Sequence, residues 1–171
     1  MAKHPIFLIV RAKIAQSSAA IEHMNAVDAQ QRNLLSNHPD LYSESVHAES
    51  LAMNVLGIYT QLEAILKTLA NAIDGYSPSG EAWHRDLLLQ VASSDENRSE
   101  VISQETMEGM VHLLRFRHAI RNNYASEIRA KEVFENVKRL QSVSSAFLSD
   151  IERFVESFAA QDAPPKPRGP S

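Results

Sequence analysis

The helical spacing of apolar residues between positions 43 and 73 constrains the fold more than any other feature of this sequence. These residues recur at intervals of three and four: Leu51, Val55, Ile58, Leu62, Ile65 and Leu69. Such spacing places all of them on one face of an α-helix. Alternating, β-branched runs bounded by turn residues, which indicate strands, are absent from the sequence. The sequence therefore predicts an all-α protein.

The same reading divides the rest of the chain into helices and loops. Helices are expected over residues 5–37, 43–73, 81–92, 103–124 and 130–158, with the clearest loop at 74–80, which contains two glycines and a proline. We predict an all-α bundle of four to five helices. The bundle is expected to form a single domain over residues 1–160, followed by a disordered, Pro-rich tail over 161–171.

Composition excludes several classes of function. The chain has 171 residues, 22% of them charged, and a net charge of −4, so a single soluble domain is expected. It contains no cysteine, which excludes disulfides and thiolate chemistry. The apolar run at 6–10 is too short to span a membrane. These features predict a cytoplasmic protein with no membrane association.

An apolar stripe on the predicted helix 103–124 becomes cationic toward its C-terminal end. The apolar part consists of Met107, Met110, Val111 and Leu114. Continued at about 100° per residue, the same face reaches Arg117, His118 and Arg121, with Asn122 and Tyr124 at its edges. Residues 111–139 as a whole carry seven Lys or Arg against three Glu. Because burying two guanidinium groups in a core is costly, this end of the helix is expected to face a cleft, a partner or an anionic ligand.

Residue chemistry alone allows three interpretations of this cationic group. A ribonuclease site would use His118 for proton transfer, with Arg117 and Arg121 holding phosphate. A recognition site would bind phosphate or an acidic partner without turnover. In a purely structural role, Arg117 and Arg121 would instead pair with a buried carboxylate such as Glu63.

Other polar residues receive simpler interpretations. Glu63 shares a helix face with Tyr59 and either faces solvent or orients an arginine. We expect Trp83 to anchor a short helix, and His84 to bond to a backbone group or lie in solvent. The histidine spacings typical of zinc sites are absent, and so are phosphate-binding glycine loops. The sequence therefore predicts neither a metal nor a cofactor.

Three segments together resemble a known family. They are residues 56–63 (LGIYTQLE), 74–88 (DGYSPSGEAWHRDLL) and 116–124 (FRHAIRNNY). Their order and spacing resemble the HepT-like branch of the HEPN superfamily, over roughly residues 45–158. The resemblance implies a HEPN-like helical bundle, so that the domain over 1–160 would be HepT-like.

The resemblance also implies a function and partners. HepT-like proteins are typically toxins of bacterial toxin–antitoxin pairs that act on RNA as metal-independent ribonucleases. Their Arg-x4-6-His motif lies in a cleft of a homodimer. The antitoxin is a minimal nucleotidyltransferase that adenylylates the tyrosine of a His-x-Tyr element.

Carried over to this chain, the motif differs at one position. Arg117 is the motif arginine, His118 follows it, and Asn122 stands where the family has its histidine. Asparagine cannot exchange a proton near neutral pH, so either His118 replaces it in catalysis or the site does not cleave. Tyr124 corresponds to the adenylylation site.

The sequence therefore predicts a HepT-like toxin, a metal-independent endoribonuclease acting at a dimer-interface cleft. The expected catalytic residues are Arg117, His118 and Asn122, with Arg121 and Tyr124 binding substrate and Glu63 and Tyr59 in support. The alternative is a degenerate HEPN module that binds RNA, a nucleotide or a partner protein without turnover. In a third possibility the cations only form a dimer interface.

Overall fold

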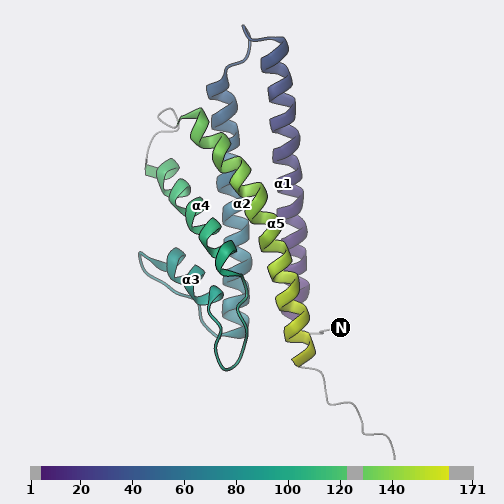
Figure 1. The fold of residues 1–171 in the computed structure, drawn as a ribbon, viewed down its shortest axis with the longest axis vertical. Helices are drawn as coiled ribbons and strands as arrows, with labels where there is room; N and C mark the ends of the chain where they lie inside the picture. Colours follow the sequence, from purple (N-terminus) through teal and green to yellow (C-terminus); the bar gives the residue numbers. More distant parts are fainter. Residues whose placement is uncertain (1–4, 123–128, 162–171) are drawn as a thin grey trace, which may run out of the picture.

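The computed structural model describes residues 5–122 and 129–161, which form five α-helices and no strand. The helices are α1 (Pro5–Asn37), α2 (Glu44–Ile73), α3 (Trp83–Ala92), α4 (Gln104–Asn122) and α5 (Ala130–Gln161). The predicted all-α bundle is confirmed (Figure 1). The division into a domain over 1–160 and a tail over 161–171 stays a prediction, and α5 extends to Gln161, beyond the helix end expected at residue 158.

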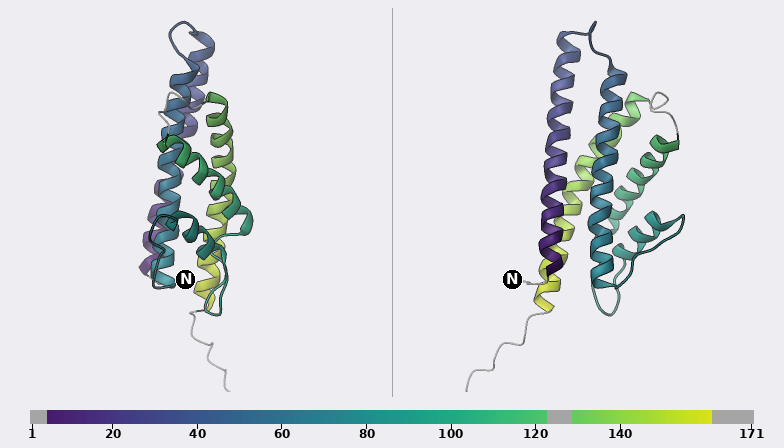
Figure 2. Two further views of the ribbon diagram at one scale, coloured as in Figure 1. Left: turned by 90° about the vertical axis from the view of Figure 1, so that its left-hand side faces the viewer. Right: turned by 180° about the vertical axis from the view of Figure 1, so that it is seen from behind.

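Helix α2 is the centre of the bundle and packs against each of the other four helices. Figure 2 shows α1 on one side of α2 and the shorter α3 and α4 on the other, while α5 runs obliquely across α1 and α2. The apolar residues used to predict α2 are all buried: Leu51, Val55, Ile58, Leu62, Ile65 and Leu69. The spacing of one apolar face therefore identified the central helix of the core.

Local sequence signals determine where α2 begins and ends. Ser43 is its N-cap, and the hydroxyl oxygen accepts a hydrogen bond from the amide of Val46 at 3.3 Å. After the helix, Gly75 and Gly80 have φ angles of 77° and 90°. Residues with a Cβ atom rarely adopt such positive φ values. The two glycines thus allow the loop to reverse the chain and place α3 against α2.

A buried arginine organises the connector between α3 and α4. Arg98 forms two hydrogen bonds with the carboxylate of Asp74, at 2.6 Å and 2.8 Å. Its guanidinium also donates to the carbonyl oxygens of Ser93 and Gln90, at 2.6 Å and 2.9 Å. A segment that the sequence marks only as polar is therefore attached to the ends of α2 and α3.

The buried face of α4 differs from the predicted stripe. Its buried residues are Thr106, Met110, Leu113, Leu114, Phe116 and Ile120, whereas Met107 and Val111 are only partly buried. The core-facing side is thus rotated toward Leu113 and Ile120. Arg117 lies within this face, and His118 and Arg121 lie outside it and are exposed. The expectation of a single continuous stripe that includes all three cations was wrong.

The part of the chain that the structure describes contains no helix with the length and apolar character needed to cross a bilayer.

Candidate functional site

Four polar side chains from three helices form a continuous hydrogen-bonded chain. Tyr59 and Glu63 come from α2, and the phenol donates to the Glu63 carboxylate at 3.1 Å. The same oxygen lies 2.5 Å from Nδ1 of His84, the second residue of α3. On the other side of the ring, Nε2 of His84 lies 3.2 Å from Nη1 of Arg117 on α4. We call these four residues the polar chain.

The two hydrogen-bond partners of His84, Glu63 and Arg117, determine which of its ring nitrogens carries the proton. A guanidinium group only donates hydrogen bonds, so Nε2 of His84 must accept from Arg117. The ring proton is then on Nδ1, from which it is donated to the Glu63 carboxylate. The polar chain therefore has a neutral imidazole between a carboxylate and a guanidinium.

The polar chain is largely removed from water. Tyr59, Glu63 and His84 are buried, and Arg117 is partly exposed. Burial, and then the charge of Glu63 and the hydrogen bond to it, raise the pKa of Tyr59 above its ordinary value, so the phenol stays protonated and acts as a donor. A protonated donor on one side and His84 on the other stabilise the buried carboxylate of Glu63.

An aromatic ring covers the imidazole of His84. The ring of Trp83 stacks on it with a centroid separation of 3.7 Å. On Trp83, the ammonium group of Lys67 lies 4.8 Å from the ring centroid. Trp83 thus shields His84 at the start of α3, as well as anchoring this short helix as the sequence predicted.

Exposed motif residues follow Arg117 along the end of α4. His118, Arg121 and Asn122 are all exposed, and together with Arg117 we call them the motif surface. The His118 ring lies edge-on to that of His84, with centroids 6.0 Å apart. The motif surface therefore shares Arg117 with the polar chain and also adjoins it through His118.

The surroundings of His118 favour its neutral form. Partial desolvation lowers its pKa below the ordinary value, and the positive charges of Arg117 and Arg121 lower it further. The Glu63 carboxylate acts in the opposite direction but is outweighed. A neutral imidazole at the surface is able to accept a proton near neutral pH.

The structure separates the alternatives left open for Glu63. The expectation that it faces solvent was wrong, because only 4% of the residue is exposed. A direct pair with an arginine was also expected, but Glu63 contacts His84 and Tyr59, and His84 in turn contacts Arg117. The carboxylate therefore acts on the arginine through an imidazole. Tyr124 lies outside the described residues.

Sequence reasoning missed His84, for which a backbone partner or solvent was expected. A signal was present in the sequence. A glutamate lies within the apolar face of one predicted helix, and a histidine lies near the start of the next helix, after a loop that can fold it back. What the sequence does not contain is the packing angle between the two helices, which determines whether their side chains meet.

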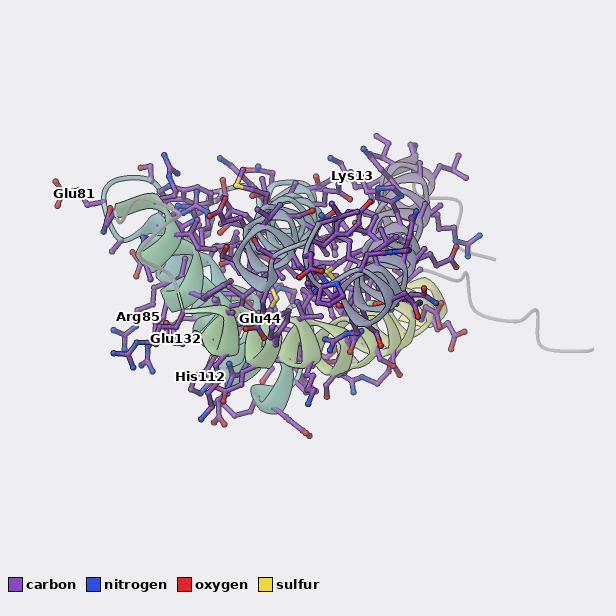
Figure 3. All side chains as sticks on the ribbon, turned by 90° about the horizontal axis from the view of Figure 1, so that it is seen from above. Lys13, Glu44, Glu81, Arg85, His112 and Glu132 are labelled. Carbon is purple, nitrogen blue, oxygen red and sulfur yellow. The ribbon has the colours of Figure 1, made fainter. Side chains whose placement is uncertain are left out.

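Other charged side chains lie on the surface away from the polar chain. Figure 3 shows side chains such as Arg85, His112 and Glu132 pointing outward around the bundle. His112 and Arg115 lie on α4 but are exposed away from the polar chain. They are therefore useful as matched controls for His118 and Arg117.

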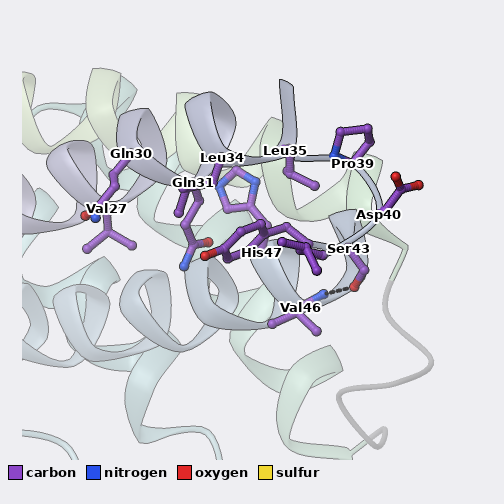
Figure 4. A pocket seen from close by; sticks show the side chains of 12 residues that line it. Val27, Gln30, Gln31, Leu34, Leu35, Pro39, Asp40, Ser43, Val46 and His47 are labelled. Atoms are coloured by element: carbon purple, nitrogen blue, oxygen red, sulfur yellow. Dashed lines mark hydrogen bonds between the residues drawn. The ribbon is translucent and has the colours of Figure 1, made fainter. Parts of the chain in front are cut away.

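A separate pocket lies between the end of α1 and the start of α2 (Figure 4). Its volume is about 560 Å³, and its lining is largely apolar, including Val27, Leu34, Leu41, Val46 and the buried His47. None of the described motif or polar-chain residues lines this pocket. It is thus distinct from the candidate site.

Comparison with known protein families identifies a match. The family model described as HepT-like protein matches residues 50–158, which is more than half of the chain and includes the polar chain and the motif surface. Searches of curated proteins and of solved structures each give no match. The chain belongs to the HepT-like family of the HEPN superfamily.

Proposed function

We propose that this HepT-like protein is the toxin component of a bacterial toxin–antitoxin pair. In this proposal it acts in the cytoplasm as a homodimeric, metal-independent endoribonuclease, and its partner is a minimal nucleotidyltransferase. Membership of the family supports the coarse assignment. The observation that carries the proposed chemistry is the position of His118, a neutral imidazole next to a guanidinium group held by the polar chain.

The arginines of the motif surface suit a phosphate ligand. A guanidinium group has five N–H donors, and the contact of Arg117 with His84 uses one of them. Arg121 lies one helical turn further and is exposed. Two guanidinium groups at this spacing would bind a phosphodiester and stabilise the additional negative charge of its transition state.

RNA cleavage without a metal needs a base and an acid. The base removes the proton of a 2′-hydroxyl group, its oxygen attacks phosphorus, and the acid protonates the departing 5′-oxygen. His118 would serve as the base. Asn122 cannot transfer a proton and would position the substrate. His84 is engaged at both ring nitrogens, so we propose that His118 of a second copy, in its protonated form, supplies the acid in a dimer cleft.

A cleavage assay with purified protein tests this function. A pool of single-stranded RNAs in the presence of a chelator should give fragments that end in 2′,3′-cyclic phosphate and 5′-hydroxyl groups. His118→Ala should abolish the products, and Arg117→Ala should reduce them by at least about tenfold. The control variants His112→Ala and Arg115→Ala remove the same groups from another side of α4 and should keep full activity.

Asn122 favours a second candidate function, which is RNA binding without turnover. This alternative predicts that RNA binds but yields no product at any protein concentration. Arg117→Ala or Arg121→Ala would then weaken binding by about tenfold, while His118→Ala would have little effect. Binding without products would therefore exclude the nuclease and support the degenerate module.

Modification by the antitoxin would act on Tyr124. Incubation with the nucleotidyltransferase and ATP should add one AMP to the chain, as measured by intact mass. Tyr124→Phe should remain unmodified. An unchanged mass of the wild-type chain under these conditions would contradict this part of the proposal.

A further inference from the structure

We propose that His84 is the positioning residue for Arg117 and that the Tyr59–Glu63–His84 segment of the polar chain orients the guanidinium group toward its anionic ligand. This proposal rests on the proposed function for the identity of the ligand, which is RNA phosphate. Its structural part, the orientation of Arg117 by His84, does not depend on that identity.

The first step concerns the direction of the hydrogen bonds. Arg117 donates to Nε2 of His84 at 3.2 Å, and Nδ1 of His84 donates to Glu63 at 2.5 Å. A neutral imidazole carries one proton, so Nε2 is free to accept because the proton is on Nδ1. Glu63 fixes this tautomer, since a carboxylate oxygen requires a proton on the atom that faces it.

The second step concerns the rigidity of the support. Glu63 also accepts from the buried hydroxyl group of Tyr59, so the carboxylate has a second anchor on its own helix. Trp83 stacks on the imidazole and limits its rotation. A flexible arginine side chain loses conformational freedom when it binds an anion. Because His84 already holds Arg117, part of this entropic cost is met before the ligand arrives.

The third step separates positioning from a merely structural role. A glutamine at position 84 places an amide near the position of Nε2 and keeps an acceptor for Arg117. An asparagine is shorter, keeps a donor near the position of Nδ1 for Glu63, and cannot reach Arg117. If His84 only fills space and satisfies Glu63, His84→Asn should be tolerated better than His84→Gln. Positioning predicts the opposite order.

A nuclear magnetic resonance measurement tests the structural part directly. Imidazole ¹⁵N signals of the full chain should show a neutral His84 with its proton on Nδ1. In Arg117→Ala the Nε2 signal of His84 should shift, because its donor is removed, whereas in Arg115→Ala it should stay unchanged. A proton on Nε2, or an Nε2 signal that does not respond to Arg117→Ala, would overturn the proposal whatever the protein does with RNA.

Binding of a fluorescent single-stranded RNA tests the functional part, with folding of each variant checked by circular dichroism. His84→Asn should weaken binding by about tenfold, close to the effect of Arg117→Ala, and His84→Gln should stay within about threefold of wild type. In Arg117→Ala the two substitutions at position 84 should have no additional effect. Equal losses for both substitutions would overturn the positioning role.

If wild-type protein neither binds nor cleaves RNA, the proposed function fails, while the tautomer measurement still decides whether His84 orients Arg117.

Discussion

Gly109 of α4 lies so close to Val143 of α5 that a Cβ atom at position 109 would overlap a γ-methyl group of the valine. The two helices therefore approach each other at the one point on α4 where a glycine leaves room. Gly109 and Arg117 lie in the same helix. The contact with Val143 therefore sets the distance between α5 and the helix that carries the motif.

Replacing this glycine should destabilise the protein although alanine favours helix formation. Gly109→Ala should lower the free energy of unfolding by about 1–3 kcal/mol, because the branched side chain of Val143 has little freedom to move away. Gly57 is the matched control: it lies in α2 with nothing within 4 Å of an added Cβ. Gly57→Ala should stabilise by about 0.5–1 kcal/mol. Urea unfolding measures both, and similar effects of the two substitutions would contradict the close approach.

The pair formed by Asp74 and Arg98 should make stability depend on acidity. The hydrogen bond from Arg98 lowers the pKa of Asp74, an effect that exceeds the opposing effect of burial. This contribution is present above the ordinary carboxyl pKa of about 3.9 and is lost as the pH falls through the lower folded-state value. Asp74→Asn should cost about 3 kcal/mol at neutral pH. In urea unfolding, the difference from wild type should shrink in acid, and a difference that is independent of pH would contradict the ion pair.

Asp150, on α5, should stabilise the start of α4. Its carboxylate accepts from the amide and hydroxyl groups of Ser103, both at 2.8 Å, and from the hydroxyl of Thr106 at 2.6 Å. Asp150→Ala leaves the Ser103 amide and the Thr106 hydroxyl group without this acceptor and should cost about 3 kcal/mol in thermal or urea unfolding. Glu152→Ala removes an exposed carboxylate of the same helix and should change stability by less than about 0.5 kcal/mol. Comparable losses in the two variants would show that α4 does not depend on this cap.

His118 should titrate below the usual histidine pKa of about 6.5. Proton signals of the ring, followed against pH, give the midpoint. Arg117→Ala removes a nearby positive charge and should raise the pKa of His118 toward its usual value, whereas Glu63→Gln removes a negative charge and should lower it further. A midpoint at or above the usual value in wild-type protein would contradict the lowering of the His118 pKa by desolvation and by the charge of Arg117.

Periodicity predicted the elements better than it predicted their orientation. The apolar spacing of α2 identified a central helix, because a long apolar face must be buried against other elements. In α4 the same reasoning predicted a buried face centred too near Met107 and Val111, whereas the observed face includes Leu113 and Ile120. Thr106 is polar but buried, and its hydroxyl group donates to Asp150. Met107 is apolar but only partly buried.

The sequence by itself determined that the chain is helical, where the helices begin and end within a few residues, and that a cationic motif lies at the end of α4. These properties follow from contacts within a few residues along the chain, for which spacing and capping are sufficient. Only the tertiary structure decided that Glu63 and His84 meet and that His84, not Glu63, contacts Arg117. The three residues lie on three helices, and the distances among them depend on packing angles and on the loop that reverses the chain after α2, neither of which has a local signature.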